Sequence, residues 1–223
     1  NGALPRRGEL NPDHVSKALG HEKPDSAEIP LNLVNRPPSL CAGCGHQDTY
    51  IALNEVIAEY GSGRVFSDIG CYTLGALPPY NTINTCVDMG ASITMAKGAA
   101  DAGLEPVFAV IGDSTFTHSG MTGLLDCVYE KTNVNLIIVD NETVAMTGGQ
   151  DSSAKGRIEK ICAGIGVEPE HIRVFVPLKK NHAEIVGIMK EEVAYKGVSV
   201  LIGRRECVQR ISRVKKMNRE ENV

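Results

Sequence analysis

The chain has 223 residues, of which 42% are hydrophobic and 22% are charged, and its formal net charge is −4 at pH 7. This composition suits the core of one sizeable domain with extensions, and the acidic balance without a large basic block argues against nucleic acid as a partner. No apolar run approaches the roughly 18–20 residues that span a bilayer, so we expect no membrane association. The first residues lack the apolar core of a signal peptide, which favours a cytoplasmic protein. Because the chain does not begin with methionine, we expect a piece of a longer protein or a processed form.

Residues 1–36 are predicted to form an arm or linker that joins the domain to a preceding part of the protein. Asn11 and Pro12 open a short stretch that ends at Gly20, which is typical of a helix with an N-cap, an N1 proline and a C′ glycine. The rest of the arm and the two residues directly after it are rich in proline, which favours an extended linker; the prolines are Pro24, Pro30, Pro37 and Pro38.

From residue 37 to residue 210, short apolar runs alternate with segments that have helical periodicity. Strands are expected at residues 64–67, 107–111, 134–139, 172–176 and 198–202. Helices are expected at residues 48–59, 91–103, 119–131, 158–163 and 181–194. In the helix at 119–131, Leu124, Leu125 and Val128 are predicted to share one buried stripe. The alternation predicts an α/β fold with a doubly wound parallel sheet.

Two further stretches are not expected to be regular. Residues 72–92 are rich in glycine, proline and asparagine and are predicted to be mostly loop, and a loop of that length in a compact domain is usually functional. Residues 211–223 form a charged tail that is expected to fray or to dock on a partner.

Polar residues follow two of the predicted strands where each strand ends. Asp113 comes after the strand at 107–111, and Asn141 comes after the strand at 134–139. Open parallel sheets bind ligands at this edge, and a carboxylate with an amide oxygen suits Mg²⁺ that also holds phosphate oxygens. Gly112 allows close backbone approach, so the expected ligand is a magnesium diphosphate. The alternative is that Asp113 and Ser114 cap a helix and Asn141 only turns the chain.

Four of the seven cysteines are candidates for metal or redox chemistry. Cys41 and Cys44 form a CxxC pair on a glycine-bearing loop, which is compatible with a redox dithiol, half a zinc site or half an iron–sulfur site. Cys71 and Cys207 each follow a predicted strand, at the edge expected to carry the ligand. The other three cysteines are assigned to packing; these are Cys86, Cys127 and Cys162.

Six sequence blocks occur in the order found in 2-oxoacid:ferredoxin oxidoreductases, and the chain most resembles the indolepyruvate branch of that family. The blocks are CAGCGHQ, SDIGCYTLGALPP, MGASI, IGDSTFTHSG, DNETVAMTGGQ and RREC. The resemblance covers roughly residues 36–210. It implies the diphosphate-binding domain of the large subunit, with the thiamine diphosphate-binding fold.

The resemblance implies that Asp113, Asn141 and the backbone carbonyl of Thr143 hold the Mg²⁺ of thiamine diphosphate. The chain departs from the thiamine diphosphate motif at Ser114, where the family has a second glycine. The expected contacts of the cofactor are Gly70, Gly90, Ala91, Ser92, Gly112, Asp113, Ser114, Asn141, Thr143, Met146, Thr147 and Gly148.

The same resemblance implies that Cys41, Cys44, Cys71 and Cys207 hold a 4Fe-4S cluster. The implied activity is oxidative decarboxylation of an arylpyruvate or another 2-oxoacid, with the acyl group passed to coenzyme A and the electrons to ferredoxin. The implied partners are a pyrimidine-binding domain and a smaller oxidoreductase subunit in an oligomer. The chain lacks the pyrimidine-binding domain and the ferredoxin-like segment of the large subunit, so we expect no turnover by this chain alone.

His46 and His118 lie close to these motifs and are candidates for proton transfer or carboxylate binding; the alternative for each is a loop or capping histidine. Two other function classes remain open from the sequence. One is the diphosphate-binding half of a non-redox thiamine-dependent decarboxylase, which needs no cluster. The other is a non-catalytic zinc-bearing or interaction domain, in which the CxxC pair is structural.

Overall fold

The computed structural model describes residues 4–5, 10–21 and 37–220, with the backbone alone for residues 215–220. The chain divides into two compact units, Asn1–Pro37 and Pro38–Val223. Among the described helices, none combines the length and the apolar character that crossing a membrane requires.

In the first unit, the predicted short helix is confirmed as α1 (Pro12–Ala18). Asn11 is its N-cap, and the Asn11 side chain accepts a hydrogen bond from the backbone N–H of His14 at 3.1 Å. Gly20 follows with a φ of 78°, which glycine adopts without the strain of a side chain. Pro24 and Pro30 of the predicted linker lie outside the described residues.

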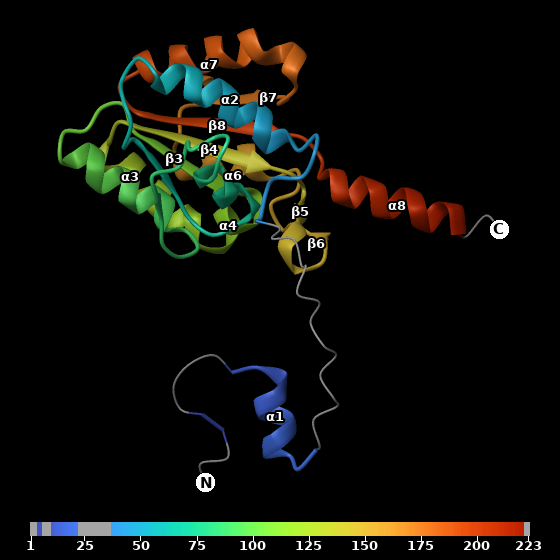
Figure 1. Ribbon diagram of the computed structural model, residues 1–223. Coiled ribbons are helices and arrows are strands. Elements are labelled where there is room, and N and C mark those ends of the chain that lie inside the picture. Colours follow the sequence, from blue (N-terminus) through green and yellow to red (C-terminus); the bar gives the residue numbers. More distant parts are fainter. Residues whose placement is uncertain (1–3, 6–9, 22–36, 221–223) are drawn as a thin grey trace. The chain divides into compact units, whose positions relative to one another are not determined.

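The second unit is built on six parallel strands in the order β2–β1–β3–β4–β8–β7 (Figure 1). The strands are β1 (Val65–Ser67), β2 (Thr85–Cys86), β3 (Phe108–Gly112), β4 (Val134–Asp140), β7 (Ile172–Phe175) and β8 (Val198–Arg204). Both β3 and β4 are buried along their entire length, which explains why their sequences are almost continuously apolar. The predicted doubly wound parallel α/β fold is confirmed.

Helices cover both faces of this sheet (Figure 1). They are α2 (Gly45–Ile57) and α7 (His182–Ala194) on one face, and α3 (Ala91–Asp101), α5 (Met121–Glu130) and α6 (Ile158–Ile165) on the other. Alternate residues of β3 belong to the two cores, because successive side chains of a strand point to opposite faces. Phe108 and Val110 pack with α2 and α7, whereas Ala109 and Ile111 pack with α3, α5 and α6.

The helix that follows β3 begins six residues earlier than predicted. It runs through α4 (Asp113–Thr115) and a π-helical turn at Phe116–Gly120 before α5. The prediction that Leu125 shares the buried stripe is wrong. Leu124 is 1% exposed and Leu125 is 54% exposed, because adjacent helical residues point about 100° apart and only one of them faces the sheet.

Three other differences concern segments without an apolar pattern. The predicted loop at 72–92 contains the end of a 3-10 helix (Cys71–Ala76) and the edge strand β2. The predicted charged tail is helical through α8 (Val208–Glu220). Cys127 and Cys162 are buried in the core as predicted, but Cys86 is exposed, so its assignment to packing is wrong.

We expect Leu124→Ala to lower the free energy of unfolding by about 2–5 kcal/mol, because it opens a cavity between α5 and the sheet. The matched variant Leu125→Ala removes the same atoms from an exposed position and is expected to change stability by at most about 0.5 kcal/mol. Urea denaturation of both variants measures the difference. Equal losses in the two variants would contradict this orientation of α5.

Candidate functional site

A cavity of about 230 Å³ lies at the carboxyl ends of β1, β3 and β4, and we call it the Asp113 cavity. Eight of the twelve residues predicted to contact the cofactor line it, namely Gly70, Gly112, Asp113, Ser114, Asn141, Thr143, Met146 and Thr147. The parallel sheet therefore brings together residues from three separate segments, at the edge where open α/β sheets bind ligands.

Asp113 is a buried polar residue of this cavity. It is the first residue of α4, is 2% exposed, and its Oδ2 atom is buried with no hydrogen-bond partner among the described residues. Burial raises the pKa of Asp113 to about 6, and the negative charge of Asp140 adds to the increase, while a hydrogen bond with Ser152 opposes it. A buried carboxylate oxygen without a donor is costly unless a cation or a proton occupies the position beside it.

Asn141 begins a tight turn at the end of β4. Its Oδ1 accepts a hydrogen bond from the backbone N–H of Thr143 at 3.1 Å, and Asp140 Oδ1 accepts one from Glu142 N–H at 3.2 Å. Glu142 has a φ of 61°, so the chain reverses within this turn. Asn141 and Thr143 of this turn both line the cavity that contains Asp113.

Tyr72 lines the Asp113 cavity and Asp68 contacts the Tyr72 hydroxyl, and neither residue was assigned a role from the sequence. The Tyr72 ring lines the Asp113 cavity and lies close to Gly112, where an added Cβ would be only 2.6 Å from the ring. The Tyr72 hydroxyl donates a hydrogen bond to Asp68 Oδ1, and its carbonyl accepts one from the Tyr50 hydroxyl at 2.6 Å. The contact with Tyr72 therefore requires a glycine at position 112, whether or not a ligand also approaches the backbone there.

The Asp68 carboxylate binds the N-terminus of α3, where a diphosphate was expected from the sequence. Its Oδ2 accepts hydrogen bonds from Gly90 N–H at 3.1 Å, Ser92 N–H at 3.3 Å and the Ser92 hydroxyl at 2.6 Å. Gly90, Ala91 and Ser92 do not line the Asp113 cavity. Their contact with a diphosphate stays a prediction, and the structure assigns the free N–H groups of α3 to a buried carboxylate.

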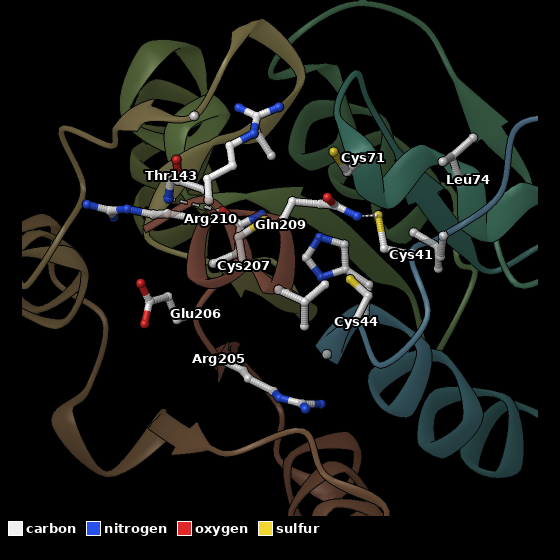
Figure 2. Close-up of a pocket in the computed structure, with 18 of the residues that line it drawn as sticks. Cys41, Cys44, Cys71, Leu74, Thr143, Arg205, Glu206, Cys207, Gln209 and Arg210 are labelled. Atoms are coloured by element: carbon white, nitrogen blue, oxygen red, sulfur yellow. Dashed lines mark hydrogen bonds between the residues drawn. The ribbon is translucent and has the colours of Figure 1, made fainter. Parts of the chain in front are cut away.

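A second cavity, of about 390 Å³, lies beside the first, and we call it the cysteine cavity. Figure 2 shows Cys41, Cys44, Cys71 and Cys207 arranged around it. Cys41 and Cys44 come from the loop before α2, Cys71 follows β1, and Cys207 directly precedes α8. All seven cysteines of the chain are free thiols.

The four thiols of this cavity are close enough to affect one another electrostatically. Burial raises the pKa of Cys44 to about 11, and the charges of Cys41, Cys207 and Cys71 add to the increase. Burial also raises the pKa of Cys71, with further contributions from Cys207 and Cys41. No three His, Cys, Asp or Glu side chains of the described residues converge closely enough to hold a single metal ion.

The two cavities share a wall made by His46, Cys71, Asn141, Thr143 and Ala145. His46 lies in the first turn of α2 and is 4% exposed, and burial lowers its pKa to about 4, so it is neutral at pH 7. The other predicted catalytic histidine, His118, is exposed and lines neither cavity. Its Nδ1 lies 3.1 Å from the hydroxyl of the adjacent Ser119.

A small hairpin and α8 bound the cavities on the remaining side. The hairpin pairs β5 (Thr143–Val144) with β6 (Gln150–Asp151), and its turn contains Gly148, which lines the cysteine cavity. Arg213 of α8 donates a hydrogen bond to the Gly148 carbonyl at 2.8 Å, and Arg210 donates one to Asp151 Oδ1 at 2.5 Å. The segment after Cys207 therefore holds the hairpin over both cavities.

Residues 68–202 match the family model described as "Thiamine pyrophosphate enzyme, C-terminal TPP binding domain". The chain belongs to this family of thiamine pyrophosphate-binding domains. It is 34% identical over 239 residues to the indolepyruvate oxidoreductase subunit IorA of Archaeoglobus fulgidus, a match covering 97% of this chain and 38% of that protein. The subunit of the same name from Methanothermobacter thermautotrophicus is also 34% identical, over 93% of this chain and 36% of that protein. The chain thus spans well under half the length of the curated relatives it matches.

Solved structures with low sequence identity have the same fold. A 2-oxoglutarate:ferredoxin oxidoreductase from Magnetococcus marinus superposes with a TM-score of 0.60 at 18% identity, covering 78% of this chain and 66% of that chain. A benzoylformate decarboxylase from Polynucleobacter necessarius superposes with a TM-score of 0.53 at 18% identity, covering 85% of this chain and 38% of that chain. Both support the doubly wound fold.

We expect Gly112→Ala to lower the free energy of unfolding by about 1–3 kcal/mol, because its Cβ would overlap the Tyr72 ring. Gly98→Ala is the matched control. Gly98 lies inside α3 with no atom within 4 Å of an added Cβ, so the change is expected to raise stability by up to about 1 kcal/mol. Thermal unfolding measures both, and a neutral Gly112→Ala would contradict the contact with Tyr72.

Proposed function

We propose that this chain is the thiamine diphosphate- and Mg²⁺-binding part of a 2-oxoacid:ferredoxin oxidoreductase of the indolepyruvate branch. The observation that carries the proposal is the pair of adjoining cavities. One contains the buried carboxylate of Asp113, whose Oδ2 has no hydrogen-bond partner among the described residues, and the other is surrounded by four cysteines. The names of the archaeal relatives support the same activity. In this proposal residues 37–210 are the cofactor-binding domain, with residues 1–36 as a linker and residues 211–223 as a charged tail.

The residues of the Asp113 cavity fit a hydrated divalent cation that carries a diphosphate. Asp113 supplies a carboxylate oxygen, Asn141 an amide oxygen and Thr143 a backbone carbonyl, and these hard oxygen ligands suit Mg²⁺. Such a set leaves coordination positions for phosphate oxygens. The N-terminus of one helix contributes only about 0.3–1 kcal/mol toward an anion, so the cation has to supply most of the stabilisation.

The four cysteines of the second cavity fit an iron–sulfur cluster better than a single ion. A 4Fe-4S cluster is held by four thiolates, and these four come from three segments that surround one cavity. Gln209 Nε2 donates a hydrogen bond to Cys41 Sγ at 3.4 Å, and hydrogen bonds to ligand sulfurs tune cluster potentials. The alternative function, a non-redox thiamine-dependent decarboxylase, gives no role to this arrangement.

In the proposed reaction, thiamine diphosphate supplies the electron sink for decarboxylation of a 2-oxoacid such as an arylpyruvate. The chain's own residues bind and orient the diphosphate end, and neutral His46 stands in the shared wall, where it could exchange a proton with a substrate carboxylate or carbonyl oxygen. Electrons would leave through the cysteine cavity toward ferredoxin, and coenzyme A would accept the acyl group.

The proposal includes partners that complete this half-site. A pyrimidine-binding domain would hold the other end of the cofactor, and a smaller oxidoreductase subunit would complete the oligomer. Ile69, Met89 and Met146 line the Asp113 cavity with exposed apolar side chains, which is consistent with a protein surface covering its mouth. Free thiols and an iron–sulfur cluster suit the reducing cytoplasm.

Asp113→Ala is expected to abolish Mg²⁺-dependent binding of thiamine diphosphate, because it removes the only carboxylate of the proposed metal site. Isothermal titration calorimetry with and without Mg²⁺ measures the loss. Asp101→Ala is the control, because Asp101 is an exposed residue of α3 paired with Lys97 and should leave binding unchanged. Undiminished Mg²⁺-dependent binding by Asp113→Ala would overturn the metal assignment.

Cys71→Ser is expected to lower the iron and acid-labile sulfide content of anaerobically prepared protein, because it removes one of four proposed ligands. Cys86→Ser is the matched control at an exposed cysteine that lines neither cavity. Metal analysis separates the function classes: iron with sulfide supports the oxidoreductase, and Mg²⁺-dependent thiamine diphosphate binding without iron supports the decarboxylase. Zinc without thiamine diphosphate binding would favour the interaction domain.

A further inference from the structure

Arg204, the last residue of β8, forms a network of hydrogen bonds and lines neither cavity. Its Nε donates a hydrogen bond to Asp140 Oδ2 at 2.6 Å, and its Nη1 and Nη2 donate to the two carboxylate oxygens of Glu159 on α6, each at 2.8 Å. The Asp140 side chain is 1% exposed, so this contact is shielded from water. The guanidinium thus links the ends of two neighbouring strands to a helix on one face of the sheet.

The two strand ends that Arg204 joins each lead into proposed ligands, namely Asn141 and Thr143 after β4 and Cys207 after β8. Asp140 and Arg204 are partners in the register of β4 and β8. Beyond them, the chains stay paired, because Arg205 N–H donates to the Asp140 carbonyl at 2.9 Å and Cys207 N–H donates to the Asn141 carbonyl at 3.2 Å. Asn141 therefore accepts from the Thr143 amide with its side chain and from the Cys207 amide with its backbone.

We propose that Arg204 is a positioning residue for both cavities, which holds the Asp140–Thr143 turn against the segment that ends in Cys207. This inference rests on the proposed function only for the statement that these two segments contain cofactor ligands. Through Arg204, the place of Asn141 beside Asp113 and the place of Cys207 beside the other cysteines depend on one another.

Removal of the guanidinium would leave Asp140 as a buried carboxylate, with the Glu142 amide as its remaining side-chain hydrogen-bond donor among the described residues. An unpaired buried charge is relieved when the chain moves it toward water, and that movement would open the turn that contains Asn141. The forked contact with Glu159 makes arginine specific here, because a lysine can pair with Asp140 but cannot form the planar two-bond contact.

The chain offers a matched control in Arg173, a residue of the edge strand β7. Arg173 Nη1 also contacts two carboxylates, Glu191 at 3.1 Å and Glu192 at 3.0 Å, and Glu192 is 2% exposed. Unlike Asp140, Glu192 also contacts the Ser199 hydroxyl at 2.7 Å and His171 Nδ1 at 2.8 Å, and neither Arg173 nor its partners line either cavity. Arg173→Met therefore reports the effect of removing an arginine–carboxylate contact that lies away from the two cavities.

Amide hydrogen exchange of the full chain, followed by NMR, tests the inference without any cofactor. In Arg204→Met we expect exchange of the Thr143 and Cys207 amides to accelerate at least tenfold relative to other protected amides, and Arg204→Lys to restore part of the protection. Arg173→Met should leave both amides at their wild-type rates. Unchanged rates in Arg204→Met, or equal acceleration in both methionine variants, would overturn the positioning role. If Arg204→Met does not fold, Arg204→Gln, which removes the cation from Asp140 but keeps a polar side chain, provides the same comparison.

Titration with thiamine diphosphate and Mg²⁺ is the second measurement. Loss of groups that orient metal ligands typically costs about 10–100-fold in metal affinity, and we expect a loss in this range for Arg204→Met but not for Arg173→Met. Equal affinity in wild type and Arg204→Met would overturn the inference. Absence of Mg²⁺-dependent binding in the wild type would instead overturn the proposed function, and the exchange rates would still decide whether Arg204 positions the two segments.

Discussion

The arrangement of the site depends on the burial of β3 and β4 on both faces of the sheet. A strand covered on both sides can carry almost no polar side chains along its length, so its polar residues are confined to its ends. In these two strands the carboxyl ends are followed by Asp113 and Asn141. Parallel pairing then places both ends at one edge, beside the ends of β1 and β8. The chemistry of the site is therefore a consequence of how the core excludes polar groups.

This constraint explains which features could be predicted from the sequence. The placement of Asp113, Asn141, Cys71 and Cys207 at one edge could be predicted because each follows a predicted strand, and a parallel sheet brings such positions together. The helices α3, α6 and α7 were found from their periodicity. The early start of the helix at Asp113 was missed because Gly112, Asp113 and Ser114 are also typical of a turn.

The features that were missed depend on contacts between distant segments. Tyr72 has no sequence signal for its position against Gly112, because that position is set by the 3-10 helix in which it lies. Asp68 satisfies the N-terminus of α3 from another strand, so the helix start could not be recognised as occupied from its own residues. The helix α8 has a mainly polar sequence, and its described contacts include those of two arginines with the β5–β6 hairpin and that of Gln209 with Cys41.

The spread of the four cysteines over the chain has a consequence for folding. Cys41 and Cys44 lie before the first strand of the sheet, Cys71 follows that strand, and Cys207 follows the strand β8. Any group bound by all four thiolates would close a loop that contains nearly the whole domain, and cross-links that close long loops remove the most entropy from the unfolded chain. When binding requires the native arrangement, the free energy of binding also stabilises the folded state. Such a group would cross-link the domain as well as carry electrons, so its loss would loosen the sheet edge at which the diphosphate is proposed to bind.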